Sequence, residues 1–362
     1  MGPLHWKRSH LCVPERSPPV KDSRAMAEAV PRRQPTLDEV AERAGVSRSV
    51  ASRALNNAPH VSRAKREAVE RAVRQLGYVP NPTARALATR QTGAAALVVS
   101  GEDPSIFADP FFARVIVGAS AALDEADLHL MLCLAASDRG RKRVEELLRS
   151  RGADGVMLMA LREDDPLTRM ADEAQMPVVF GGRPVGSAPR WYVDVDNVGG
   201  AREATEHLVS LGRRRVAVIC GRLDTEAGRA RYRGYRDAML GAGLDPFPPL
   251  EGDFTERSGA AAMAALLVGH PDVDGVFAAN DNMAAGALRT LREAGRRVPA
   301  DVALVGFDDL TVARIADPPL TTVHQPVEAL GREMARMLVA LVNGQDPTPL
   351  LLPTRLAVRA SA

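Results

Sequence analysis

The first part of the chain has the periodicity of short helices. Between residues 36 and 77, apolar residues recur on one helix face, and residues that begin or end helices separate the runs. Thr36 and Glu39 form a T-x-x-E pattern, whose side chains satisfy free backbone N–H groups at a helix start. The residues placed to begin three helices are Thr36, Ser47 and Ser62, and the glycines suited to the turns after the first and third are Gly45 and Gly77.

Beyond Thr92 the pattern changes to apolar runs that alternate with amphipathic segments. The apolar runs lie at 94–99, 128–134, 155–160, 177–180, 216–220, 275–280, 302–307 and 320–324. The amphipathic segments include 111–126, 141–151, 198–211, 256–269 and 283–294. Such alternation predicts parallel sheets covered by helices on both faces. Because roughly 270 residues are too many for one doubly wound sheet of ordinary size, we expect two similar lobes.

These patterns divide the chain into four parts. Residues 1–31 are rich in proline, arginine and serine without sustained periodicity, so we expect a disordered extension, with Met26 as an alternative start of translation. A small all-α helix-turn-helix domain is expected over 32–80. A short hinge helix and linker follow over 81–92, where an Asn-Pro pair suits a helix start. Residues 93–362 then form a two-lobed α/β core.

The formal net charge of +2 hides a strong asymmetry along the chain. Residues 32–92 hold twelve Arg or Lys and five Asp or Glu, whereas residues 93–362 hold 30 basic and 37 acidic residues. A small basic module therefore precedes a larger acidic body. Such a division indicates a polyanionic partner for the basic module.

Composition excludes several classes of protein. The chain is 46% hydrophobic and 25% charged, which is typical of a globular protein and not of a fibrous or disordered one. Its three cysteines are too far apart in sequence for a disulfide framework or a zinc ligand set, so no metal or cofactor is expected. There is no apolar run of membrane-spanning length and no apolar core of a secretory signal. We therefore expect a cytoplasmic protein.

The predicted helix-turn-helix would place its second helix in the major groove of DNA. Arg48 and Ser49 lie at the N-terminal end of that helix, and Arg53 follows about one turn later on the same side. An arginine can donate two hydrogen bonds to guanine, so these positions suit base reading. The other candidate DNA contacts are Thr36, Ser47, Ser52 and Asn56. A helical bundle with a solvated charged face is the alternative interpretation.

The combined motifs resemble one family. The segment TLDEVAERAGVSRSVASRALNNAPHVS resembles the N-terminal module of the LacI/GalR family of bacterial transcription regulators, and YVPNPTARALA resembles its hinge helix. The similarity continues in DNVGGAREATEHLVSLGRRRVAVICG, AANDNMAAGALR, VALVGFDDL and DPPLTTVHQP, and covers about residues 34–358. It implies a core with the fold of type I periplasmic binding proteins. It also implies that Leu87 wedges into the minor groove, with Ala84 beside it.

A ligand site is expected where strands of the core end. Open α/β sheets bind ligands beyond the carboxyl ends of their strands. Asn280 is the last residue of one apolar run, and Asp308 and Gln325 directly follow two others. Their amide and carboxylate groups suit the hydroxyls of a sugar or polyol, and each residue matches a ligand position of the family. The resemblance adds the candidates Phe111, Phe112, Arg231 and Phe254, and Glu163 is a weaker one.

No motif of a common enzyme class is present. The sequence lacks a nucleophile elbow, a phosphate-binding P-loop, a dinucleotide fingerprint and a zinc-protease motif. We therefore expect a protein that is not an enzyme. The family resemblance implies a homodimeric repressor that binds double-stranded operator DNA, joins the nucleoid when bound, and responds to a small carbohydrate effector. The alternative is a solute-binding protein of a sugar transport system, which would share the core fold. The basic N-terminal module and the missing secretory signal count against it.

Overall fold

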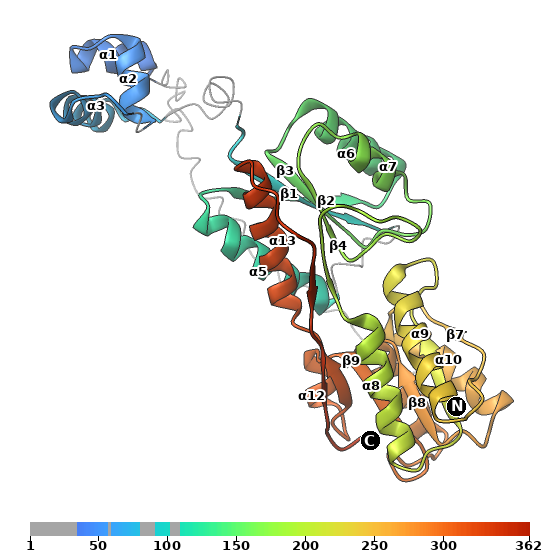
Figure 1. Ribbon diagram of the computed structural model, residues 1–362. Coiled ribbons are helices and arrows are strands. Elements are labelled where there is room, and N and C mark those ends of the chain that lie inside the picture. The colour runs from blue at the N-terminus through green and yellow to red at the C-terminus, as the bar shows by residue number, and fades with distance from the viewer. Residues whose placement is uncertain (1–34, 57–58, 80–90, 102–108) are drawn as a thin grey trace, which may run out of the picture. The chain divides into compact units, whose positions relative to one another are not determined.

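A computed structural model describes residues 35–56, 59–79, 91–101 and 109–362 of the protein (Figure 1). The chain separates into two compact units, Met1–Asn81 and Pro82–Ala362. The hinge residues Ala84 and Leu87, which the sequence resemblance singles out, lie outside the described residues.

The first unit is a cluster of three helices. These are α1 (Leu37–Ala44), α2 (Arg48–Leu55) and α3 (Arg63–Leu76). The capping box predicted for Thr36 and Glu39 is confirmed, because each side chain accepts a hydrogen bond from the other residue's backbone N–H. Gly45 ends α1 in the left-handed conformation, at φ 65°. Ser62 precedes α3 as predicted, but its side chain makes no capping bond.

Small residues let the three helices pack closely. Val40, Ala51 and Val69, one from each helix, are fully buried at the centre of the unit. Half-buried apolar side chains, such as Leu37 and Leu76, surround them. The core of this unit is therefore small, and most of the polar face of α2 is left at the surface.

The second unit consists of two lobes, each built on a six-stranded sheet. The first lobe has the strand order β11-β5-β4-β3-β1-β2, and all of its pairs are parallel. Its strands are β1 (Ala94–Ser100), β2 (His129–Ala135), β3 (Gly155–Met159), β4 (Val178–Gly181), β5 (Tyr192–Val195) and β11 (Leu350–Leu352). The helices α5 (Pro110–Glu125) and α13 (Val327–Val342) cover one face, and α6 (Asp138–Ser150) and α7 (Pro166–Glu173) cover the other.

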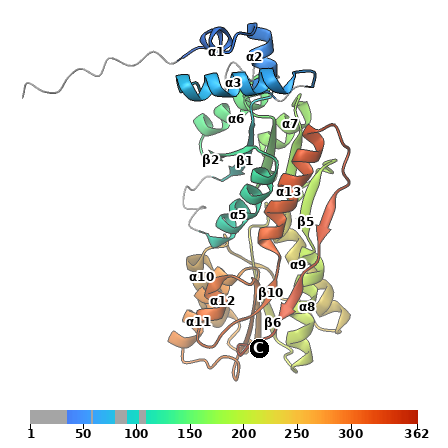
Figure 2. The ribbon, with the colours of Figure 1, turned by 90° about the vertical axis from the view of Figure 1, so that its left-hand side faces the viewer.

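Helices α5 and α13 lie side by side on the first lobe (Figures 1 and 2). Glycines allow this close approach of the two backbones. A Cβ atom at Gly118 would lie 1.9 Å from the Glu328 carbonyl oxygen, and one at Gly331 would lie 2.1 Å from that of Val115. Either added methyl group would push the two helices apart.

The second lobe has the strand order β12-β10-β9-β8-β6-β7. Its strands are β6 (Val216–Cys220), β7 (Leu250–Glu251), β8 (Gly275–Ala278), β9 (Ala303–Asp308), β10 (Thr321–His324) and β12 (Arg355–Ala357). The helices α8 (Asn197–Ser210) and α9 (Glu226–Gly241) cover one face, and α10 (Glu256–Gly269), α11 (Asp281–Glu293) and α12 (Thr311–Ile315) lie on the other. The predicted parallel sheet is confirmed except at its edge, where β12 pairs antiparallel with β10.

The chain passes between the lobes at three places. It leaves the first lobe between β5 and α8, returns between β10 and α13, and crosses again between β11 and β12. Asn197, Gln325 and Thr354 lie at these three crossovers. None of the helices in the described ranges is both long and apolar enough to cross a membrane.

Candidate functional site

The exposed face of α2 carries the candidate base readers. Ser47 caps the helix through a hydrogen bond from the Val50 backbone N–H to its hydroxyl. Arg48 and Ser49 follow at the helix start, and both are exposed. Arg53 is exposed one turn later, and its Nε donates to the Ser49 carbonyl oxygen at 3.2 Å. The helix therefore presents two guanidinium groups and a hydroxyl on one accessible surface.

The polar contacts within this surface are weak enough to be replaced by contacts with DNA. Arg48 lies 3.4 Å from Asp38, but their side chains are 70% and 66% exposed. An ion pair this exposed contributes little stability, typically about 0–1 kcal/mol. Asn56 is exposed at the end of α2, and Thr36 and Ser52 are half-buried. The Thr36 hydroxyl takes part in the capping box, so it also stabilises the start of α1.

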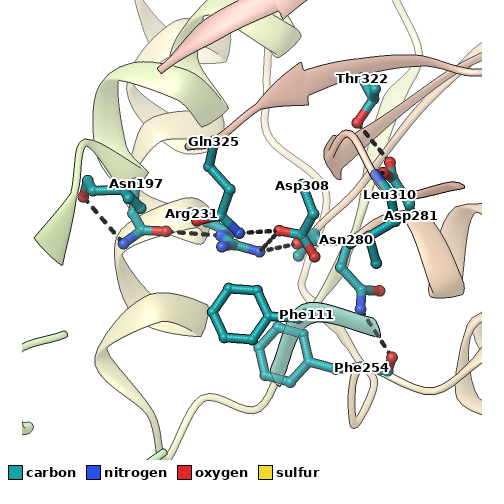
Figure 3. Close-up of polar contacts among 12 residues, drawn as sticks. Phe111, Asn197, Arg231, Phe254, Asn280, Asp281, Asp308, Leu310, Thr322 and Gln325 are labelled. Atoms are coloured by element: carbon teal, nitrogen blue, oxygen red, sulfur yellow. Dashed lines mark hydrogen bonds and ion pairs between the residues drawn. The ribbon is translucent and has the colours of Figure 1, made fainter. Parts of the chain in front are cut away.

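A cavity of about 540 Å³ lies between the lobes of the second unit. All seven candidate effector contacts line it: Phe111, Phe112, Arg231, Phe254, Asn280, Asp308 and Gln325. The two phenylalanines of the first lobe follow Asp109 and Pro110 at the start of α5, where Asp109 caps the helix. Their rings meet edge to face, with centroids 5.2 Å apart. Figure 3 shows Phe111 and Phe254 beneath the row of polar groups that ends at Asp308 and Asn280.

The centre of the cleft is a buried ion pair between Arg231 and Asp308. Arg231 Nη1 lies 3.3 Å from Asp308 Oδ1, and its guanidinium stacks 3.7 Å from the ring centre of Phe307. Gln325 Nε2 donates to the same Oδ1 at 2.5 Å. Both protein contacts thus fall on one carboxylate oxygen, and no bond from a described residue reaches the other. Burial, with a smaller contribution from the Asp109 charge, raises the pKa of Asp308 to about 7, although Arg231 opposes this shift.

The neighbouring Asp309 has the opposite environment. Its carboxylate lies 2.9 Å from Arg314, 2.5 Å from Arg359 and 3.1 Å from His324. Burial alone would raise the pKa of Asp309, but these hydrogen bonds outweigh burial and lower the pKa to about 2. Both aspartates have positive φ angles, 109° for Asp308 and 55° for Asp309, and such strained backbone is concentrated at functional sites. The Asp-Asp pair is therefore buried and strained.

Asn280 lines the cavity, and its side-chain amide also has a structural role. Its Oδ1 accepts from the Met283 backbone N–H and caps α11, and its Nδ2 donates to the Phe254 carbonyl oxygen at 2.9 Å. Phe254 itself has φ 70°, which a bulky residue rarely adopts. The amide thus holds the aromatic ring in the cleft, and half of its hydrogen-bonding capacity is left for a ligand.

Sequence reasoning missed Asp281, which is fully buried behind the cleft. Its carboxylate accepts from the Leu310 backbone N–H at 2.7 Å and from the Thr322 hydroxyl at 2.5 Å (Figure 3). It thereby fixes the loop that carries Asp308. Burial and the charge of Asp308 raise the pKa of Asp281 well above its usual value. The only sequence signal was an acidic residue next to Asn280 in an apolar segment.

A second missed group joins the two lobes. Arg183 Nε donates to Asp194 at 3.0 Å, Asn197 donates to the same carboxylate, and Arg231 Nε donates to Asn197. Glu163, a weaker sequence candidate, does not line the cavity. It pairs instead with Arg229 of the second lobe, at 2.5 Å.

A helix-turn-helix unit on the same chain as a two-lobed binding core defines a ligand-responsive transcription regulator. A family model for bacterial regulatory proteins of the lacI family matches residues 36–81, and one for a periplasmic binding protein-like domain matches residues 205–362. The HTH-type transcriptional regulator CelR of Thermobifida fusca is 50% identical over 336 residues, which cover 91% of this chain and 99% of that protein. This chain belongs to the LacI family and is a transcription regulator.

Solved structures agree with this assignment. The complex of the transcriptional regulator CelR with cellobiose has a TM-score of 0.72 and 48% identity, covering 91% of this chain and 100% of that one. The lac repressor dimer bound to operator and the anti-inducer ONPF has a TM-score of 0.79 and 28% identity, covering 91% and 99%. The expected fold class and the regulator function are confirmed, and the transport-protein alternative is wrong.

Proposed function

We propose that the protein is a homodimeric repressor whose operator affinity is controlled by a sugar bound in the cleft. The observation that carries this proposal is the buried Arg231–Asp308 pair, which faces the cavity with the rings of Phe111 and Phe254 nearby. A carboxylate and a guanidinium bind hydroxyl groups, and aromatic rings cover the apolar faces of a sugar ring. A cavity of about 540 Å³ also falls within the usual range for ligand sites.

The effector is a gluco-disaccharide such as cellobiose. This proposal draws on CelR, since that protein is known in complex with cellobiose and is 48% identical in the aligned structures. The cleft fits a neutral polyhydroxy ligand because side chains of both lobes offer it hydrogen-bond donors and acceptors. Asp308 accepts hydrogen bonds from ligand hydroxyls through Oδ2, which no described residue contacts. Arg231 donates to the ligand, and the Gln325 amide can donate and accept.

The DNA contacts follow from the exposed face of α2. Arg48, Ser49 and Arg53 read base edges in the major groove. The residues that position the helix on the phosphates are Thr36, Ser47, Ser52 and Asn56. By the family likeness, Leu87 enters the minor groove beside Ala84. Two copies read the two halves of a pseudo-palindromic operator, because operator symmetry mirrors the symmetry of a dimer.

The protein acts without catalysis, in the cytoplasm, and is associated with the nucleoid when it is bound to its operator. The polar groups of the cleft are assigned to effector binding, and the sequence shows none of the common catalytic motifs. Its DNA-binding domain spans residues 32–80, its hinge spans 81–92 and its core spans 93–362.

A thermal-shift experiment on the full chain tests the effector. Cellobiose, other disaccharides and monosaccharides are compared at equal concentration, because a ligand that binds only the native state raises the melting temperature. Cellobiose is expected to raise it, and Asp308→Ala is expected to abolish the shift. A shift that persists unchanged in Asp308→Ala would place the sugar elsewhere.

A further inference from the structure

The side-chain amide of Asn197 bonds to both lobes. Its Oδ1 accepts from Arg231 Nε, on α9 of the second lobe, at 2.9 Å. Its Nδ2 donates to Asp194 Oδ1, on β5 of the first lobe, at 3.1 Å. Asp194 in turn accepts from Arg183 at 3.0 Å. A continuous polar path therefore runs from Arg231 across the crossover to Arg183 of the first lobe. Figure 3 shows its first step, the bond between Arg231 and Asn197.

Helix α8 does not need this side chain in order to begin. Asp196 caps the helix by accepting from the Gly199 backbone N–H at 2.8 Å. Asn197 is only the first helical residue, where its side chain has no capping duty. The amide is nevertheless 95% buried and fully engaged, so its placement is explained by the contacts it makes across the crossover.

The other crossovers lack this double attachment. Gln325 donates to Asp308, and Thr354 donates to the Asp196 carbonyl oxygen at 3.3 Å. Of these three crossover side chains, Asn197 is the one with hydrogen bonds to side chains of both lobes in the described structure. A rotation of one lobe against the other at residues 195–197 has to stretch either the bond to Arg231 or the bond to Asp194. Because the amide is buried, water cannot readily replace a broken bond.

We propose that Asn197 is a positioning residue of the effector switch, which ties the guanidinium of Arg231 to Asp194 at the lobe crossover. An effector that draws Arg231 toward itself thereby changes the angle between the lobes. Arg183 anchors the far end of the path, since its guanidinium fixes Asp194. This inference rests on the proposed function, because it assigns Arg231 to the effector.

Three full-length variants separate the steps of this path. Asn197→Ala removes the bonds to Arg231 and Asp194, together with a third bond from Nδ2 to the Val195 carbonyl oxygen at 3.2 Å. The loss of a hydrogen bond to a charged group weakens effector binding roughly 10–100-fold and also reduces coupling. Asp194→Asn keeps the acceptor oxygen for Asn197 but removes the charge that holds Arg183. Because Asp194 also lines the cavity, this variant lowers effector affinity, but less than Asn197→Ala does, and it reduces coupling as strongly. Thr205→Val is the control, because Thr205 is fully buried on the same helix and bonds only to its own turn.

Coupling is measured as the ratio of operator dissociation constants with and without saturating cellobiose. The wild type and Thr205→Val are expected to show a change of roughly 5–150-fold, whereas Asn197→Ala and Asp194→Asn fall below about threefold. A merely structural role would lower the melting temperature without this split between affinity and coupling. Equal ratios in all four proteins would overturn the proposal.

A second readout does not depend on any sugar. The ¹⁵N-labelled Nε–H signal of Arg231, assigned by its loss in Arg231→Lys, is expected to shift and to exchange faster with water in Asn197→Ala but not in Thr205→Val. An unchanged signal would overturn the positioning role. If no sugar changes the operator affinity of the wild type but the Arg231 signal shifts in Asn197→Ala, the proposed effector is wrong and the positioning of Arg231 by Asn197 stands.

Discussion

Effector affinity should rise with pH, because the ligand needs the ionised form of Asp308. The carboxylate accepts ligand hydroxyls when charged, and its pKa in the unliganded protein is about 7. At pH 6 only about a tenth of the molecules then carry the charged form, and at pH 8 about nine tenths do. The dissociation constant of cellobiose should therefore be about tenfold larger at pH 6 than at pH 8.

Isothermal titration of the full chain with cellobiose at several pH values measures this effect. The control is Asp308→Asn, which keeps the acceptor oxygen for Arg231 and Gln325 but cannot ionise. It should bind more weakly, with little dependence on pH. The same dissociation constant for the wild type at pH 6 and pH 8 would refute the reasoning.

The stability of the unliganded protein should respond to the same group with the opposite sign. The folded state raises the pKa of Asp308, so it binds this proton more tightly than the unfolded chain does. The contribution of Asp308 is therefore fully present below about pH 4 and is lost as the pH rises toward about 7. The effector then compensates for this loss by interacting with the charged form.

Three further predictions address the other parts of the molecule. Gly221→Ala should weaken cellobiose binding at least about tenfold in titration calorimetry and leave operator binding unchanged, because the new Cβ would lie 2.0 Å from Cζ of Phe254 and displace the ring. Cellobiose affinity equal to that of the wild type would contradict a role of this ring in binding. Arg53→Ala should reduce the free energy of operator binding by about 1–3 kcal/mol and relax the base preference at one position in a binding selection, whereas Arg63→Ala should weaken binding to all sequences alike. An unchanged base preference in Arg53→Ala would show that α2 is not the recognition helix. Deletion of residues 1–90 should leave a sugar-binding core without DNA affinity in gel retardation, and retarded DNA at physiological salt would show that another surface binds it.

Local signals in the sequence predicted the elements of the first unit and the position of the cleft. The Thr36 capping box and the Gly45 turn depend only on neighbours in sequence, so they could be read directly. The placement of Asp308 and Gln325 at strand ends also follows from the strand pattern, since parallel strands end at one edge of a sheet.

The remaining parts depend on contacts between residues far apart in sequence. Strand β5 reads YVDV, and its buried Asp194 argues against a strand until Arg183 and Asn197 satisfy it. Strand β7 has only two residues and no pattern of its own. Asp281 contacts Thr322 across 41 positions, and no local rule could reveal that bond.

Operator affinity with and without the effector tests the central claim most directly. Operator fragments are first selected from random DNA by the full chain, and one is labelled for fluorescence anisotropy. Saturating cellobiose should change the operator dissociation constant by roughly 5–150-fold in the wild type and should leave that of Asp308→Ala unchanged. An operator affinity that is the same with and without every sugar, or an unimpaired response in Asp308→Ala, would contradict the account.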